Sequence, residues 1–381
     1  MKLATKAAIA AITLSISGCS LFGSPAPGID PSQRGATPVG WIYSTLYSKN
    51  AVLEINNLQS RAEKEPIIVP NGPRSLAIDP RGRGEYLYVV CELGNTVAIV
   101  DRRNRLVNRS IDVGRQPYDI AISPAGERAF VSNLGDDTVS IIDMKSQTVI
   151  QTISLRPSTG TNPGTGTAPT QLRPQGIVTN ATGTRVYVAC QAGQVVMLES
   201  ATPTGQFSAT RTVVLSGSVG PQNIAINSEG QNETVYITDP PGNRLFFFNA
   251  NNQTNTAEVR DITGGPWGVA VGRNPTTNKN DRLYVTVKQP PALLPLTLDT
   301  NLSIATSNGQ GLSVEGTDPT AVAVSPIGDQ VYVSLSGNNT VTVFRREGSV
   351  IARPEQFNVQ QLRSDFIAPT GDLALGGFLF Q

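Results

Sequence analysis

Short hydrophobic runs alternate with short polar runs along most of the chain. β-branched and aromatic residues gather in runs of about four to seven, as in Tyr88-Val-Val and in Thr96 to Asp101, and Gly, Pro, Asn or Asp bounds each run. No long stretch has the spacing of an amphipathic helix. The pattern therefore predicts many short strands joined by tight turns, with helix nearly absent.

The runs belong to a repeat. Each unit begins with a proline, here called the marker proline, which is followed three and four residues later by an aliphatic residue and usually Ala. A Gly-containing turn comes next, and then a strand of aromatic, aliphatic and small residues and a further β-branched strand. Residues 117–143 show the unit most clearly. Four short strands in about 45 residues predict one blade of a β-propeller. The marker prolines are Pro73, Pro117, Pro174, Pro221, Pro266 and Pro319.

Six units and a fragment predict a single all-β, seven-bladed β-propeller over residues 41–381. Residues 41–70 supply the last three strands of a blade, because Tyr43 precedes Val52 by the spacing that separates Tyr88 from Val97. Residues 367–372 resemble residues 324–329, so we expect them to supply the missing inner strand. N-terminal and C-terminal segments sharing one blade would close the ring without an exposed edge. Residues 373–381 fit no repeat position.

The unit P-x-x-I-A-x-S-P-x-G-x-x-x-[YF]-V-[SA]-N, followed by [DN]-T-V-S-[IV]-[IV]-D, resembles the YVTN repeat of bacterial seven-bladed propellers. Residues 117–143 match it best, and the likeness extends over residues 41–345. The resemblance implies the fold strongly. It is poor for function, because these lactonase-like and surface-layer-like propellers have many roles.

The first residues have the features of a targeting signal. Lys2 and Lys6 precede an apolar run at residues 7–16, and Ile16-Ser-Gly-Cys19 resembles the bacterial lipobox. The resemblance implies a signal peptide at residues 1–18, lipidation of Cys19, and a Pro-, Gly- and Ser-rich tether at residues 19–40. Ser20 favours the outer membrane, facing the periplasm, in a Gram-negative cell. An ordinary secretory signal with a chance Cys is the alternative.

Composition narrows the chemistry. Charged residues make up 15% of the chain and the net charge is +1. The overall charge therefore gives no indication that the protein binds nucleic acid. The chain has no His. This excludes Ser-His-Asp and Cys-His nucleophile systems, His-ligated metals and His-ligated haem. No cofactor is expected, although an oxygen-ligated calcium ion stays open.

The topology of a blade predicts where a site would lie. The second-to-third-strand loops and the connections between blades should share one face, here called the top. The residue after each marker proline should stand there, at the mouth of the central channel, where aromatic rings could stack a ring or sugar and arginines could bind a carboxylate or phosphate. A functionless solvated rim is the alternative. The candidates are Arg74, Tyr118, Gln175, Gln222, Trp267 and Thr320, with Arg115 and Arg173 just before their prolines.

Other polar residues carry weaker signals. Asp101 and Asp143 occupy one repeat position, so turn capping explains them, and we extend this to Asp79. Asp239 lies in a top-face loop and stays a candidate ligand-binding residue. Cys91 and Cys190 fall in non-neighbouring blades, which predicts two buried free thiols. The insertions at residues 156–172 and 288–318 would overhang the mouth or be inert.

These features predict a monomeric, non-catalytic, lipid-anchored β-propeller of the cell envelope that binds a small ligand or an envelope protein through its top face. No catalytic residue is assigned. The alternative is a lactonase-like hydrolase that uses carboxylates and a divalent cation, with Asp239 and the rim arginines as candidates. Electron-transfer propellers would need axial metal ligands that this chain lacks, and single-stranded nucleic acid is disfavoured by the charge.

Overall fold

The computed structural model describes most of the chain from residue 41 to residue 358. The signal peptide, Cys19 and the tether, all predicted within residues 1–40, lie outside the described residues. So do the strand predicted at residues 367–372 and residues 157–170 of the insertion predicted at residues 156–172. The described ranges are 41–56, 61–62, 65–81, 85–156, 171–229, 232–299, 304, 311–325, 327–337, 340–347, 350–351 and 355–358.

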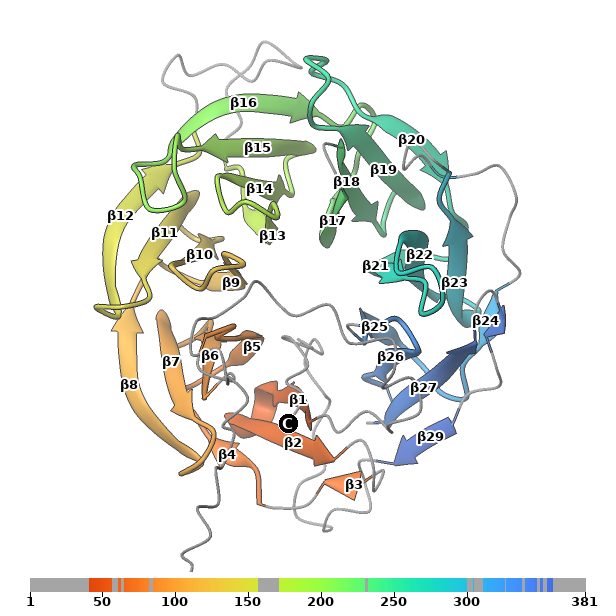
Figure 1. Ribbon diagram of the computed structural model, residues 1–381, viewed down its shortest axis with the longest axis horizontal. Helices are drawn as coiled ribbons and strands as arrows, with labels where there is room; N and C mark the ends of the chain where they lie inside the picture. Colours follow the sequence, from red (N-terminus) through yellow and green to blue (C-terminus); the bar gives the residue numbers. More distant parts are fainter. Residues whose placement is uncertain are drawn as a thin grey trace, which may run out of the picture.

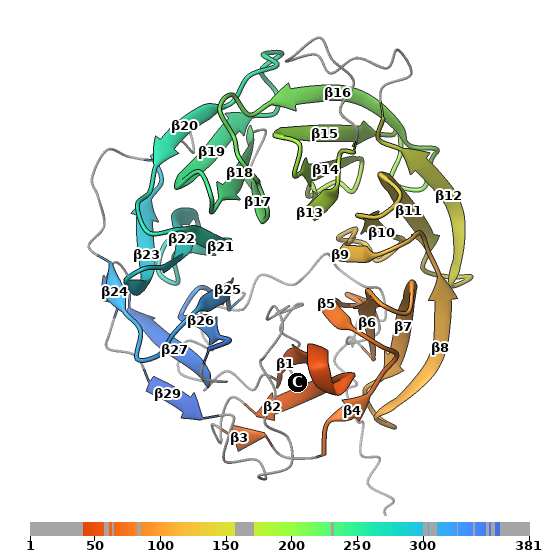
Figure 2. The same ribbon diagram turned by 180° about the vertical axis from the view of Figure 1, so that it is seen from behind.

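Seven antiparallel sheets stand around a central opening, which confirms the seven-bladed β-propeller (Figures 1 and 2). Blade 1 contains β1 (Trp41–Leu46), β2 (Ala51–Asn56), β3 (Arg61–Ala62) and β4 (Ile67–Ile68). Blade 2 contains β5 (Pro73–Ile78), β6 (Tyr86–Cys91), β7 (Thr96–Asp101) and β8 (Leu106–Asp112). Blade 3 contains β9 (Pro117–Ile122), β10 (Arg128–Asn133), β11 (Thr138–Asp143) and β12 (Thr148–Ser154). Blade 4 contains β13 (Pro174–Thr179), β14 (Arg185–Cys190), β15 (Gln194–Glu199) and β16 (Ser208–Val214).

Blade 5 contains β17 (Ile224–Glu229), β18 (Asn232–Asp239), β19 (Arg244–Asn249) and β20 (Glu258–Asp261). Blade 6 contains β21 (Pro266–Arg273), β22 (Asn280–Lys288), β23 (Pro291–Thr297) and β24 (Leu312–Ser313). Blade 7 contains β25 (Pro319–Val324), β26 (Gln330–Leu335), β27 (Thr340–Glu347), β28 (Val350–Ile351) and β29 (Glu355–Asn358). The helical content of the described residues is a single 3-10 turn, η2 (Tyr47–Lys49), and none of them forms a helix of the length and apolarity needed to cross a membrane.

Residues 41–70 form the outer strands of blade 1, as the sequence predicts. β1 pairs with β2, and β2 pairs in turn with β3 and β4. Tyr43 on β1 and Tyr88 on β6 are both fully buried, as the shared repeat position requires. The segment expected to add the inner strand lies beyond the described residues.

The core lies between the blades, because each sheet is apolar on both faces. The aromatic residue on the second strand of each blade is fully buried. Phe130 is an example: its ring packs edge-on against Phe207 of the next blade, with the ring centroids 5.0 Å apart. Burial of one such side chain contributes about 1.5–3 kcal/mol. Two-faced burial accounts for the low charge of the chain. The buried aromatic residues are Tyr43, Tyr88, Phe130, Tyr187, Tyr236, Tyr284 and Tyr332.

A recurrent clasp defines the top face. Asn50, Asn95, Asp137 and Asn243 each end a second-to-third-strand loop in a left-handed conformation, with φ between 51° and 55°. Each side chain accepts a hydrogen bond from the backbone N–H directly before the next marker proline, at distances of 2.7–2.9 Å. Asn and Asp suit this position because they tolerate a positive φ better than other non-glycine residues. The clasp ties each loop to the following blade and places both on one face.

The opposite face, here called the bottom, holds the turns predicted there. Asp101 accepts hydrogen bonds from the backbone N–H groups of Arg103 and Asn104, and Asp143 does the same for the turn after it, which confirms turn capping. Hydrogen bonds from the Ser146 backbone, together with the nearby Arg128, hold the pKa of Asp143 below its usual value against the opposing effect of burial. These aspartates are structural.

Candidate functional site

A β-bulge sets apart the residue after the marker proline. Pro73 pairs with Cys91 and Ser75 pairs with Val90, so Arg74 has no partner in the ladder. A bulged residue leaves the regular alternation and its side chain is redirected. The register shifts in the same way around Tyr118, Gln175, Trp267 and Thr320. In blade 5, Gln222 lies just before β17 instead.

Hydroxyl groups of the repeat fix these positions from the neighbouring blade. Thr45 donates to the Arg74 carbonyl at 3.1 Å, Ser132 to the Gln175 carbonyl at 2.6 Å, and Thr238 to the Trp267 carbonyl at 2.5 Å. In these blades a Ser or Thr on the second strand therefore bonds to the residue after the marker proline of the next blade. The backbone after the marker proline is therefore held from the neighbouring blade at these three positions.

Blades 1 to 3 form a cluster here called the Arg74 cluster. The Arg74 guanidinium lies over the Tyr118 ring, 3.8 Å from its centroid, and its Nη1 donates to Glu92 Oε2 at 3.0 Å. The Tyr47 hydroxyl donates to the same Glu92 oxygen at 3.1 Å. Partial burial, followed by the Glu92 charge, raises the pKa of Tyr47. The cluster combines a cation, a carboxylate and two aromatic rings.

Blades 6 and 7 form a second group, here called the Lys288 cluster. The Lys288 ammonium lies 3.4 Å from the centroid of the half-buried Trp267 ring and 2.7 Å from Asp318 Oδ1. Ser336 donates to the other Asp318 oxygen. Burial tends to raise the pKa of Asp318, but the hydrogen bonds from Lys288 and Ser336 outweigh it and the pKa is lowered. Like the Arg74 cluster, it combines a cation, a carboxylate and an aromatic ring.

The two clusters belong to different parts of the ring. Tyr118 is the second residue of β9 and Trp267 the second residue of β21, and these strands face each other across the central opening (Figure 1). Each aromatic face is covered by a cation from its own surroundings. The structure therefore does not place both rings against one small ligand. Glu92 and Lys288 were not singled out in the sequence, although both lie four residues after the repeat tyrosine, at Tyr88 and Tyr284.

The remaining predicted rim residues differ in their surroundings. Thr320 is buried and shares a hydrogen bond with the Ser334 hydroxyl at 2.9 Å. Gln175 is buried at 4% exposure, and the backbone carbonyl of Gln222 accepts from Gly176 N–H at 3.0 Å. Arg115 is exposed and pairs with Asp136 at 2.5 Å. Arg173 is exposed, and its backbone N–H is held by Asp137.

Asp239 anchors a loop. Its side chain is fully buried, and Oδ2 accepts from Ser218 Oγ at 2.9 Å and from Val219 N–H at 2.8 Å. Oδ1 accepts from the N–H groups of Gly220 and Gly242 at 2.9 and 3.2 Å. The neighbouring blade has Gly193 where other blades have the clasping Asn or Asp, so Asp239 ties this loop from the other side. Within the described residues, no group of three or more acidic, Cys or His side chains is arranged to hold a metal ion.

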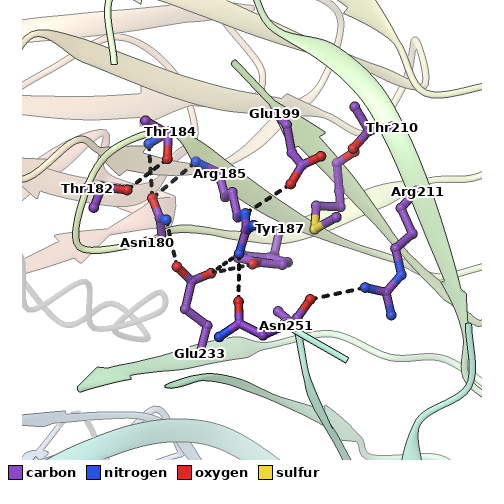
Figure 3. A network of polar contacts seen from close by, with 12 residues as sticks. Asn180, Thr182, Thr184, Arg185, Tyr187, Glu199, Thr210, Arg211, Glu233 and Asn251 are labelled. Atoms are coloured by element: carbon purple, nitrogen blue, oxygen red, sulfur yellow. Dashed lines mark hydrogen bonds and ion pairs between the residues drawn. The ribbon is translucent and has the colours of Figure 1, made fainter. Parts of the chain in front are cut away.

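A polar network on the bottom face joins blades 4 and 5 (Figure 3). Glu233 accepts from the Tyr187 hydroxyl at 2.6 Å and from Asn180 Nδ2 at 2.8 Å, and Arg185 pairs with Glu199 at 2.9 Å. Burial, followed by the hydrogen bond to Glu233, raises the pKa of Tyr187. Glu233 of blade 5 thus bonds to Asn180 and Tyr187 of blade 4, so we interpret the network as a structural link between the two blades.

Fold and rim define a seven-bladed β-propeller with its candidate site at the channel mouth. Residues 57–163 match the family model described as "Lactonase, 7-bladed beta-propeller". This segment includes Arg74, Glu92 and Tyr118, and it covers less than a third of the chain. No curated protein is significantly similar in sequence.

Solved structures share the fold at low identity. A periplasmic gluconolactonase from Pseudomonas aeruginosa is 16% identical, with a TM-score of 0.65 over 89% of this chain and 99% of that one. A virginiamycin B lyase from Staphylococcus aureus is 15% identical, with a TM-score of 0.57 over 79% and 87%. A hydrazine synthase chain from Kuenenia stuttgartiensis is 19% identical, with a TM-score of 0.55 over 72% and 76%. Since proteins with such different names share one fold, the fold alone does not identify the function of this chain.

Proposed function

We propose that the protein is a non-catalytic binding module of the bacterial cell envelope, anchored by a lipid on Cys19, which recognises a ligand or protein partner through the mouth of its channel. The observation that carries the proposal is the pair of cation–aromatic–carboxylate clusters at the rim. Both are built from positions that the fold holds in place but does not prescribe. Aromatic rings beside charged groups are common at binding sites.

The polar chemistry of the rim suits recognition better than catalysis. The chain has no His to act as a base near neutral pH. Asp239, the carboxylate considered for catalysis, is fully buried and accepts four hydrogen bonds from the loops around it. A carboxylate held in this way is committed to the fold.

Affinity capture from solubilised envelope tests the proposal. The wild-type protein should retain a specific partner or ligand, and the double variant Trp267→Ala, Tyr118→Ala should lose it. Thr152→Ala, at an exposed position on the outer strand β12, is the control and should behave as the wild type. Equal capture by the double variant and the wild type would exclude the rim as the binding surface.

A lactonase-like hydrolase is the second candidate. The match of residues 57–163 to the lactonase propeller family favours it, as does the gluconolactonase among the structures of similar fold. Purified protein should then hydrolyse glucono-δ-lactone above the spontaneous rate, with a dependence on calcium and on a rim carboxylate such as Glu92. Hydrolysis at the spontaneous rate, with and without calcium, would remove this candidate.

A further inference from the structure

Rim polar groups pair with one another in most blades but not at the boundary between blades 4 and 5. The Arg74 and Lys288 clusters join blades 1 to 3 and blades 6 to 7. At the equivalent positions of blades 4 and 5 stand Gln175 and Gln222. The Oε1 atom of each is buried and has no hydrogen-bond partner among the described residues. A buried acceptor without a donor is unfavourable, so a donor that reaches either oxygen would stabilise it.

The backbone at Gln175 lies next to the backbone at Gln222. Gly176 N–H, next to Gln175, donates to the Gln222 carbonyl at 3.0 Å. A Cβ atom at Gly176 would come within 2.8 Å of that carbonyl oxygen, so this position accepts only glycine. Ser132 holds the Gln175 carbonyl, and the Thr238 carbonyl accepts from Gln222 N–H at 2.9 Å. We call this pair of fixed positions the glutamine seam.

A buried negative charge adjoins the seam. Asp239 follows Thr238, and its four hydrogen-bond donors are neutral. Among the described residues it forms no ion pair. Arg244 donates to the Gly217 carbonyl in the same loop but pairs with Asp261 at 3.6 Å, and the side chain of Arg173 is exposed. The charge of Asp239 therefore favours a cation over a neutral donor.

We propose that the glutamine seam binds the primary ammonium group of a ligand, an inference that rests on the proposed binding role of the rim. An ammonium group offers three N–H donors and no acceptor, which complements amide oxygens that lack a donor. The next blade already holds an alkylammonium group against an aromatic ring, since Lys288 lies over Trp267. Neither glutamine Oε1 accepts a hydrogen bond from a described residue, so a donor that reaches it displaces no existing donor.

Titration of the full chain with n-propylammonium, with 1-propanol as the neutral counterpart, tests the proposal. Side-chain amide resonances of glutamine in ¹H–¹⁵N spectra report contact directly. The resonances of Gln175 and Gln222 should shift and saturate with propylammonium and stay unmoved by propanol. Gln175→Leu and Gln222→Leu should each weaken binding about tenfold.

Gln194→Leu is the matched control. Gln194 is also buried, at 2% exposure, and its Oε1 also lacks a partner, but it begins β15, the third strand of blade 4. This variant should bind propylammonium as the wild type does. Gln222→Glu keeps both acceptors and adds a negative charge, so it should tighten binding, and it serves if the leucine variants do not fold.

Three results would overturn the inference. They are the absence of saturable shifts, an equal response to propanol, and a crystal structure in which an ordered water bridges the two amides and propylammonium does not displace it. If partner capture depends on Trp267 and Tyr118 but propylammonium does not bind, the ammonium site is wrong and the proposed binding role of the rim is unaffected. If partner capture does not depend on these residues and propylammonium does not bind, both proposals are wrong.

Discussion

The guanidinium of Arg74 covers the ring of Tyr118, although the two residues belong to different blades and are 44 positions apart in the sequence. Their interaction energy can be measured in a double-mutant cycle with Arg74→Met and Tyr118→Leu. We expect a coupling of about 0.5–1 kcal/mol from urea unfolding, because Arg74 stays partly exposed. Additive effects of the two substitutions would show that the contact contributes nothing to stability.

Asp239→Asn should destabilise the protein by about 2–4 kcal/mol. The asparagine keeps one acceptor oxygen, but in either orientation its NH₂ group faces a pair of donors that the carboxylate accepted from. Urea unfolding measures the loss. Asp261→Asn is the control, because the Asp261 side chain is 87% exposed, and it should change stability by less than about 0.5 kcal/mol. Similar effects of the two variants would contradict the anchoring role.

Thr238→Val should cost about 1–2 kcal/mol, because it removes the hydroxyl that holds the Trp267 carbonyl and leaves a buried acceptor with one donor fewer. Asn223 still donates to that carbonyl at 3.1 Å. Thermal or urea unfolding measures the cost, and Thr152→Val at an exposed position is the control. A wild-type stability for Thr238→Val would mean that this inter-blade bond is dispensable.

The contact of Lys288 with Asp318 should depend on pH. Folding lowers the pKa of Asp318, so the stabilisation is present above the ordinary pKa of the carboxyl group and is lost as the pH falls through the lowered value. Lys288→Met should therefore destabilise the protein more at pH 7 than at pH 3. The difference should stay below about 1 kcal/mol, because the pair is partly exposed. Equal losses at both pH values would exclude the linkage.

Cys91 and Cys190 should be inert in the folded protein. Both are free and buried, and burial raises the pKa of Cys91 to about 12. Burial, followed by the charge of Asp137, also raises the pKa of Cys190. In a Cys19→Ser variant, a thiol reagent at pH 8 should react only after addition of urea, with two thiols per chain. Rapid reaction of the native variant would contradict this placement.

The fold was predictable because its signal is local and repeated. Each unit has its proline and buried aromatic at similar spacing, so most strands between residues 73 and 347 could be anticipated one blade at a time. The exception is the insertion predicted at residues 288–318, because β23 and β24 lie within it and complete the sheet of blade 6. The free thiols and the turn-capping aspartates followed from repeat position as well. The same reasoning placed the outer strands of blade 1.

The bulged positions could be counted from the sequence, but the contacts of their side chains could not. Counting from the marker proline selects Arg74, Tyr118 and Trp267, and the bulges fall where the count places them. Pairing with Glu92 or Lys288 depends on side-chain directions across separate strands, which the repeat does not encode. Asp239 gave no signal of its anchoring role, because three of its donors are backbone N–H groups present at nearly every residue.

The bulge after the marker proline has an evolutionary consequence. A duplicated blade inherits its ladder, its buried aromatic and its inter-blade hydroxyl, and these constrain the copy. The bulged residue lies outside the ladder, so each copy can change it without altering the hydrogen bonds between strands. A ring built by duplication therefore carries a set of positions around one opening that can diverge while the sheets stay the same.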